Sequence, residues 1–202
     1  MSNLRFSVGL AILTTTLLGV VISTSTLAEV PPDRCFHFVD GTILDYYNNE
    51  GDNTANPACP KAVSIPAAIG GVPVTAIGGA AFSSKALTSV TIPSSVTTIG
   101  YSAFYDNSLT TITVPNTVTY IGAGAFALNP TLTSATLGTG ITEIANSLFS
   151  DSGFTSFTIP SSVTSIGDSA FAANQLTSVT IPGSVTSIGV ILNSPPNQDT
   201  LV

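Results

Sequence analysis

The sequence repeats itself with a regular period. An isoleucine followed by glycine or alanine recurs with spacings of 22, 22, 23, 22 and 22 residues, at Ile77, Ile99, Ile121, Ile144, Ile166 and Ile188. Phenylalanines keep the same period, at Phe82, Phe104, Phe126, Phe149 and Phe171. A period in the twenties is typical of solenoids, in which each repeat forms one coil and stacks on its neighbours. The sequence therefore predicts a solenoid that presents long repetitive surfaces in place of one deep pocket.

Each repeat is predicted to contain a strand, a second extended segment and a turn. In the repeat over residues 87–108, the first strand follows the Leu-x-x-Leu-x-Leu spacing of leucine-rich repeats. Pro93 ends this strand, because proline has no N–H to donate to a ladder. Residues 96–99 form the second extended piece, and a short helical turn then packs Phe104 inward. We expect a β-rich (α/β) leucine-rich-repeat solenoid with coils of about 22 residues.

The repeat resembles the BspA-like leucine-rich repeat family. The resemblance rests on the iterated pattern Leu-Thr-Ser-Val-Thr-Ile-Pro-x-Ser-Val-Thr-Ser-Ile-Gly-x-x-Ala-Phe-x-x-Asn, which is closest in residues 154–175 and extends over residues 62–189. The repeat that begins at Leu132 departs most from this pattern, at Gly138, Ala145 and Leu148. Because this family occurs on secreted and surface proteins of bacteria and is regarded as one of binding and adhesion proteins, the resemblance implies such a role.

The first 28 residues are predicted to be a secretory signal peptide. Arg5 supplies a positive n-region, residues 8–22 form an apolar run, and Thr26-Leu27-Ala28 offers a small-residue cleavage site. An uncleaved anchor is the alternative, but the run is shorter than the roughly 20 apolar residues that span a bilayer. We therefore expect a protein that is secreted or held at the cell envelope, with no membrane insertion of the mature chain.

Charge restricts the partners. Eleven acidic residues face four basic ones, a formal net charge of −7. Nucleic-acid-binding proteins carry a basic footprint, so neither nucleic acid nor an anionic membrane surface is expected as a partner. Few charges fall within the repeats, and their solubility is expected to rest on serine and threonine hydroxyls.

Residues 29–61 are predicted to form a disulfide-pinned N-terminal cap. Cys35 and Cys59 are the only cysteines, and in an exported chain two cysteines indicate one disulfide. A metal site of both cysteines and His37 is the alternative, but it lacks a fourth ligand. Calcium binding by the acidic run is a further alternative, although the run lacks the register of a calcium loop; its oxygens would come from Asp45, Asn49, Glu50 and Asp52. We expect a solvated turn there, and no metal.

The other end of the solenoid lacks a recognisable cap. The repeats are predicted to end at residue 189, and residues 190–202 form an irregular tail. Solenoids usually need a polar capping unit for solubility. Three explanations stay open: the tail improvises a cap, the uncapped coil associates end to end with another copy, or the chain is a truncated piece of something longer.

No enzymatic chemistry or cofactor is predicted. A Ser-His-Asp triad would have to use His37, the single histidine, which lies outside the repeats. Gly167-Asp168-Ser169 is similar to a nucleophile motif, but Gly100-Tyr101-Ser102 occupies the same slot of another repeat. Three asparagines each follow a repeat phenylalanine by three residues, and we expect them to satisfy backbone groups between coils rather than bind a ligand: Asn107, Asn129 and Asn174.

The candidate binding surface is the outward side of the first strands. All fifteen positions are serine or threonine: Thr88, Ser89, Thr91, Thr110, Thr111, Thr113, Thr133, Ser134, Thr136, Thr155, Ser156, Thr158, Thr177, Ser178 and Thr180. Threonine suits strands, and hydroxyls keep an uncharged sheet soluble, which is a purely structural explanation. Leucine-rich repeats nevertheless commonly present this face to partners. Large aromatic and arginine anchors, which dominate most interfaces, are absent from it.

The leading hypothesis is a secreted or cell-surface binding or adhesion module that contacts a protein or glycan through this Ser/Thr-rich surface. The alternative is a passive repeat scaffold or a fragment of a larger surface protein. Ice binding is a third hypothesis, because regular rows of threonine can order water, although only Thr111-Ile112-Thr113 has threonine at both positions of the doublet.

Overall fold

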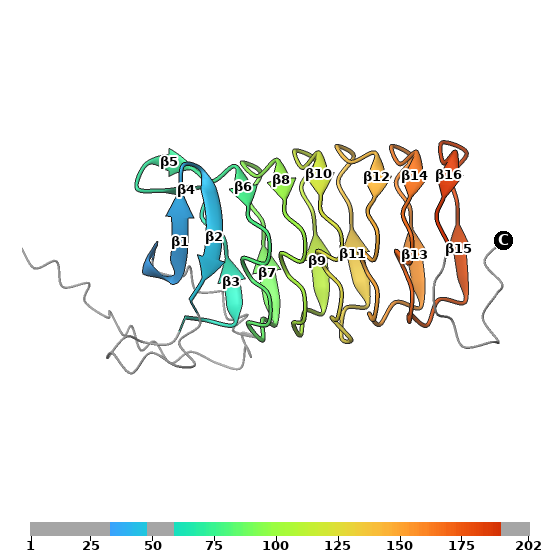
Figure 1. The fold of residues 1–202 in the computed structure, drawn as a ribbon, viewed down its shortest axis with the longest axis horizontal. Helices are drawn as coiled ribbons and strands as arrows, with labels where there is room; N and C mark the ends of the chain where they lie inside the picture. Colours follow the sequence, from blue (N-terminus) through green and yellow to red (C-terminus); the bar gives the residue numbers. More distant parts are fainter. Residues whose placement is uncertain (1–32, 48–58, 191–202) are drawn as a thin grey trace, which may run out of the picture.

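The computed structural model describes residues 33–47 and 59–190. These residues form a β-solenoid with repeats of about 22 residues, in the manner of leucine-rich repeats (Figure 1). Each coil contributes one strand to each of two parallel rows that run along the long axis of the molecule. The predicted solenoid is confirmed.

The first row contains the strands with the Leu-x-x-Leu-x-Leu pattern. Its members are β3 (Ala62–Ser64), β7 (Ser89–Thr91), β9 (Thr111–Thr113), β11 (Ser134–Thr136), β13 (Ser156–Thr158) and β15 (Ser178–Thr180). The second row follows the Ile-Gly markers. Its members are β6 (Ala76–Ile77), β8 (Thr98–Ile99), β10 (Tyr120–Ile121), β12 (Glu143–Ile144), β14 (Ser165–Ile166) and β16 (Ser187–Ile188). Wherever neighbouring strands of a row pair, the pairing is parallel, with equivalent residues of successive repeats in register.

A hairpin extends the second row at its N-terminal end. After the 3-10 turn η1 (Asp33–Cys35), strand β1 (Phe36–Val39) pairs antiparallel with β2 (Thr42–Tyr46). Strand β2 in turn pairs parallel with β6, so the hairpin continues the row. The extra residues of the first coil form a small antiparallel hairpin of β4 (Ala68–Ile69) and β5 (Val72–Pro73).

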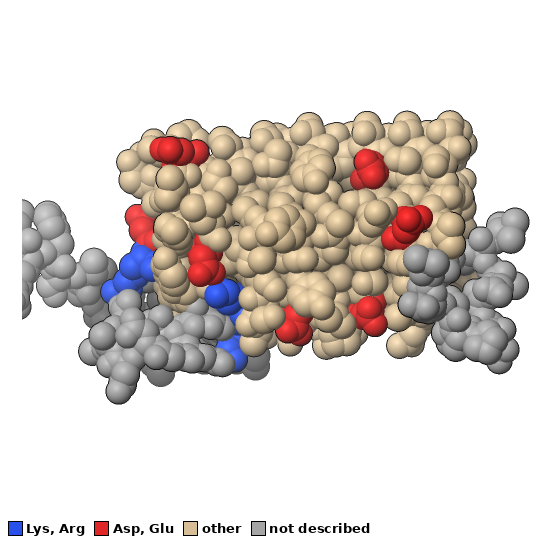
Figure 2. Space-filling model, in the orientation of Figure 1, with Lys and Arg blue, Asp and Glu red and all other residues tan. Residues whose placement is uncertain are grey.

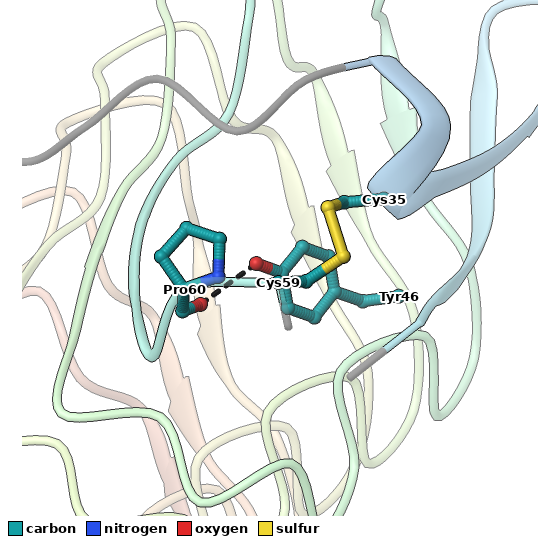
Figure 3. The surroundings of a disulfide bond; sticks show 4 residues. All are labelled: Cys35, Tyr46, Cys59 and Pro60. Atoms are coloured by element: carbon teal, nitrogen blue, oxygen red, sulfur yellow. Dashed lines mark hydrogen bonds between the residues drawn. A yellow bond between two sulfur atoms is a disulfide. The ribbon is translucent and has the colours of Figure 1, made fainter. Parts of the chain in front are cut away.

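A disulfide ties this hairpin to the start of the first row. Cys35 and Cys59 are bonded, with their Cα atoms 5.8 Å apart (Figure 3), which confirms the predicted pairing. Beside it, the hydroxyl of Tyr46 donates a hydrogen bond of 2.7 Å to the carbonyl oxygen of Pro60. Burial raises the pKa of the Tyr46 phenol, so the hydroxyl stays protonated and keeps this bond under all ordinary conditions.

The repeat phenylalanines form a continuous column through the core. Successive ring centroids from Phe82 to Phe171 lie 5.0, 5.4, 5.7 and 5.8 Å apart, with the rings stacked. Tyr46 stacks on the first ring at 5.1 Å and so links the N-terminal hairpin to the column. Because a single coil cannot bury both faces of its own ring, the stability of each coil depends on its neighbours.

The short helical turn expected at each phenylalanine is not present. Phe104 lies in a tight turn between Ser102 and Asp106, which have φ values of 50° and 56°. A right-handed helix requires negative φ at every residue, so these left-handed positions exclude one. The backbone N–H of Phe104 instead donates to the carbonyl of Ala125 in the next coil, at 2.8 Å. The only helical element in the described part of the chain is η1, and the fold is a β-solenoid rather than an α/β one.

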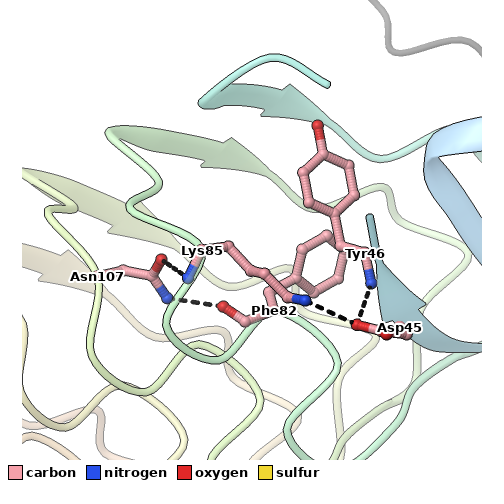
Figure 4. Close-up of polar contacts among 5 residues, drawn as sticks. All are labelled: Asp45, Tyr46, Phe82, Lys85 and Asn107. Carbon is pink, nitrogen blue, oxygen red and sulfur yellow. Dashed lines mark hydrogen bonds and ion pairs between the residues drawn. The ribbon is translucent and has the colours of Figure 1, made fainter. Parts of the chain in front are cut away.

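The buried asparagines join consecutive coils, as predicted. The side-chain amide of Asn107 donates to the carbonyl of Phe82 in the preceding coil at 2.8 Å (Figure 4). Its oxygen accepts the N–H of Leu87 at 2.9 Å. Asn129 and Asn174 repeat these contacts. Each asparagine thus satisfies backbone groups that the turn would otherwise leave buried without a partner.

Candidate functional site

The fifteen predicted serine and threonine residues lie together on the outer side of the first row. In β9 the burial pattern is exposed, buried, exposed, with Ile112 pointing into the core. Fourteen of the fifteen hydroxyl residues are exposed, and Ser89 is half-buried. We call this surface the hydroxyl face. Its geometry matches the sequence prediction, while its binding role stays a prediction.

Charged side chains are sparse along the coils. Figure 2 shows basic side chains near the N-terminal end of the visible face and isolated acidic side chains farther along it. At the N-terminal end, Lys85 forms an ion pair of 3.1 Å with Asp45 of β2 (Figure 4). The hydroxyl face is therefore suited to partners that are recognised by hydrogen bonding and shape rather than by charge.

The coil over residues 132–153, which we call the divergent coil, pairs with a different neighbouring coil through each of its two strands. Its first strand, β11, pairs backward with β9, and its second strand, β12, pairs forward with β14. Among the described residues, β11 has no ladder to β13 and β12 has none to β10; the first row is also interrupted between β7 and β9. Figure 1 shows wide gaps at these two junctions. The divergent coil is therefore tilted against its neighbours.

Departures from the repeat pattern explain the tilt. The residue that lengthens one repeat spacing from 22 to 23 precedes Leu132. The N–H of Leu132 donates to the backbone carbonyl of Asn129 at 2.8 Å, whereas the equivalent N–H of other coils donates to an asparagine side chain. Gly138 then allows the backbone of the divergent coil to approach the preceding coil closely, because a Cβ at this position would meet the carbonyl oxygen of Pro115. The coil is thus drawn against the preceding coil at this corner and opens away from it at β12.

The tilt opens a groove on the hydroxyl face. This first groove lies between β11 and β13 and has a volume of about 450 Å³. Ala135 and Phe157, which are equivalent residues of the two strands, lie between its hydroxyl-bearing walls. Five residues of the hydroxyl face line it: Thr133, Ser134, Thr136, Ser156 and Thr158. The hydroxyl face is therefore hollowed between β11 and β13.

A second groove, of about 330 Å³, lies in the second row between β10 and β12. Tyr120 and Glu143 are both exposed on its walls. Sequence reasoning missed both, although a signal was present. The equivalent position of every other coil carries a small residue: Ala76, Thr98, Ser165 and Ser187.

The last described coil presents an apolar end. Ile181, Ile188 and Val190 are 40%, 57% and 63% exposed. An apolar cavity of about 100 Å³ lies among Phe171, Val179 and Ile188. The sequence predicts association with another copy at this end; the end is apolar, and the association itself stays a prediction. The predicted tail beyond residue 190, like the signal peptide and residues 48–58, lies outside the described residues.

The other candidate residues are not brought together. The imidazole of His37 stacks on Tyr47 of the N-terminal hairpin at 6.3 Å. Ser169 has a φ of 54° and occupies the same turn position as Ser102 and Ser147. Asp45, the described member of the proposed calcium ligands, is engaged by Lys85 and by the N–H of Tyr46.

Residues 33–47 and 59–190 contain no cluster of three metal-ligating side chains. Within the same ranges, no helix is long and apolar enough to cross a membrane.

The repeat pattern matches a known family model. The model of the BspA type leucine rich repeat region matches residues 75–192 in six copies. The chain belongs to this family. BspA-like repeat proteins are typically surface or secreted proteins. No curated protein matches the chain.

Solved structures show the same fold. A leucine-rich repeat protein from Bacteroides ovatus is 32% identical with a TM-score of 0.58, over 63% of this chain and 33% of that one. The pneumococcal vaccine antigen PcpA is 21% identical with a TM-score of 0.55, over 70% of this chain and 35% of PcpA. This chain therefore matches about a third of the length of each of these proteins.

Proposed function

We propose that this BspA-like repeat protein is an exported binding or adhesion module that contacts a protein or glycan through the hydroxyl face. The observation that carries the proposal is the first groove, which hollows this uncharged face of serine and threonine side chains between β11 and β13. Uniform hydroxyl rows supply many weak hydrogen-bonding groups, whereas a concave site supplies the shape that selects one ligand. The partner is expected to span several coils, with the first groove at the centre of the contact.

The test is a set of lysine substitutions on this face. The oxidised protein is applied to arrays of purified extracellular proteins and glycans, and any ligand found is titrated. The triple variant Thr111→Lys, Ser134→Lys and Ser156→Lys is expected to abolish binding, because long charged side chains would cover the first groove and its approaches. Circular dichroism checks that the variant is folded.

Two controls accompany this test. Lysines at Ser94, Ser161 and Gln175, which are exposed positions off the hydroxyl face, add the same charge and should leave binding unchanged. His37→Ala should also have no effect. Unchanged binding in the Thr111/Ser134/Ser156 variant would refute the proposal.

The apolar end supports self-association as a second role. We propose that two copies associate through their last coils and bury Ile181, Ile188 and Val190, which the described residues leave exposed. Light scattering should then give twice the monomer mass for the full chain, with dissociation on dilution. Ile188→Lys should shift the equilibrium to monomer. A monomeric wild-type protein at high concentration would exclude this role.

A further inference from the structure

The second groove is open because a backbone ladder is interrupted. At the preceding junction, the N–H groups of Thr119 and Gly122 donate to the carbonyls of Thr97 and Ile99 at 2.9 and 2.8 Å. At the following junction, Thr164 and Gly167 donate in the same way to the divergent coil. Between β10 and β12, within the described residues, neither equivalent bond is formed.

The interruption leaves polar groups free in the walls. The N–H groups of Thr142 and Ala145 make no bond to the preceding coil, and the carbonyls of Thr119 and Ile121 accept none from β12 or its flanks within the described chain. The hydroxyl of Thr142 is likewise without the bond that its equivalents make to the preceding coil: Thr75, Thr97, Thr119, Thr164 and Thr186. The second groove therefore offers both donors and acceptors.

Two side chains that are unusual for their repeat position stand at this opening. Tyr120 is 59% exposed, and Glu143 is the only charged residue that lines the second groove. Neither the Tyr120 hydroxyl nor the Glu143 carboxylate has a hydrogen-bond or ion-pair partner among the described residues. An exposed aromatic ring, a carboxylate and unpaired backbone groups thus surround about 330 Å³ of space, at the small end of the range for ligand pockets, about 300–1,000 Å³.

We propose that the second groove is a carbohydrate-binding site that takes a neutral hexose residue of a glycan. The apolar C–H face of a pyranose ring would stack on Tyr120, because an aromatic ring offers a large flat apolar surface. The Glu143 carboxylate would accept hydrogen bonds from sugar hydroxyls, since a carboxylate only accepts and has two oxygens. The free N–H groups of Thr142 and Ala145 would donate to other hydroxyls of the same residue.

The mixture of donors and acceptors selects a neutral sugar over other ligands. A primary ammonium group would suit Tyr120 and Glu143, but it only donates and would leave the N–H groups of Thr142 and Ala145 without acceptors. An anionic sugar would lie beside a carboxylate with no cation in the lining, and like charges repel. Sugar hydroxyls both donate and accept, so they match every group in the walls.

The proposal is tested with a printed array of neutral, anionic and amine-bearing oligosaccharides. The full oxidised chain is expected to bind neutral glycans, and the best ligand is then titrated in solution. Tyr120→Thr and Glu143→Ser replace each residue by the type found in other coils, so both variants should fold. Each is expected to lower the affinity at least about tenfold, a difference of about 1.4 kcal/mol. Ser165→Ala, at the equivalent position of a closed junction, should have no effect.

A second measurement locates the bound sugar. Hydrogen exchange of the Thr142 and Ala145 amides should slow when the glycan binds, while exchange at Thr119 and Gly122 stays the same. The triple lysine variant of the hydroxyl face should retain glycan binding at the second groove, which separates this proposal from the proposed function. Absence of glycan binding, binding only to anionic glycans or amines, or full affinity in Tyr120→Thr would overturn it.

Discussion

The divergent coil and the regular coil over residues 87–108 share a core and differ in how their second strands pair. Phe104 and Phe149 are both fully buried in the same ring column. In the regular coil, β8 pairs with strands on both sides, whereas β12 pairs only with the following one. The comparison teaches that the column holds coils together even where a ladder is interrupted. A solenoid of this kind can therefore open a groove without losing its core.

The largest expected effect tests whether the core is common to both coils. Phe104→Ala should lower the free energy of unfolding by about 3–5 kcal/mol. Phe149→Ala should cost at least as much, because this ring also contacts Phe154 and Phe157 at 5.2 and 5.4 Å. Urea unfolding measures both. A clearly smaller loss for Phe149→Ala would mean that the divergent coil is loosely packed.

The asparagine position distinguishes the two coils next. Asn107→Ser should destabilise the protein by about 1–3 kcal/mol for each buried backbone group that it leaves unpaired. The main groups affected are the carbonyl of Phe82 and the N–H of Leu87. The divergent coil already has Ser152 at this position, and its hydroxyl is buried without a partner.

The reverse substitution, in the divergent coil, should stabilise the protein by a smaller amount. Ser152→Asn should stabilise by under about 1 kcal/mol, because the N–H of Leu132 is already bonded to the backbone of Asn129. Thermal melting of both variants measures the asymmetry. Stability changes of equal size in Asn107→Ser and Ser152→Asn would show that the residue inserted before Leu132 does not alter the contacts of this position.

A glycine pair tests the close approach at the corner. Gly138→Ala should destabilise by about 1–3 kcal/mol, because the added methyl would press on the backbone of Pro115. Gly183→Ala is the matched control, since a Cβ there has no atom within 4 Å, and its effect should stay within about 0.5 kcal/mol. Equal effects would argue against a close contact at Gly138.

The smallest perturbation needs no mutation. In the free protein, the amides of Thr142 and Ala145 should exchange with deuterium faster than those of Thr164 and Gly167, which are bonded across a closed junction. Mass spectrometry of short peptides measures this. Equal protection would mean that β10 and β12 pair in solution.

Much of this architecture was predictable from particular residues. The isoleucine and phenylalanine periods predicted the coils, because each marks a position that must be buried in every repeat. The asparagine contacts followed from the rule that buried polar groups need partners. The hydroxyl face followed from the alternation of side chains along a strand.

The rest depends on contacts between coils. Non-glycine residues such as Ser102 and Asp106 carry no sequence signal for positive φ; the hydrogen bonds to the next coil hold them there, and the expected helical turn was wrong for that reason. The 23-residue spacing marked an insertion, but it did not indicate which neighbour each strand would join. Tyr120 and Glu143 break the small-residue pattern of their repeat position, but that pattern did not predict the groove that they line between β10 and β12.

The ring column also gives the molecule an internal optical reporter. The chain contains no tryptophan, so tyrosine is its lowest-energy emitter. Tyr46 is buried 5.1 Å from Phe82 at one end of the column, close enough for phenylalanine excitation to pass to it. Light absorbed by the column can thus emerge as tyrosine emission from the N-terminal end. Breaking the stack at any one coil would shorten the path, so fluorescence could follow the loss of order coil by coil.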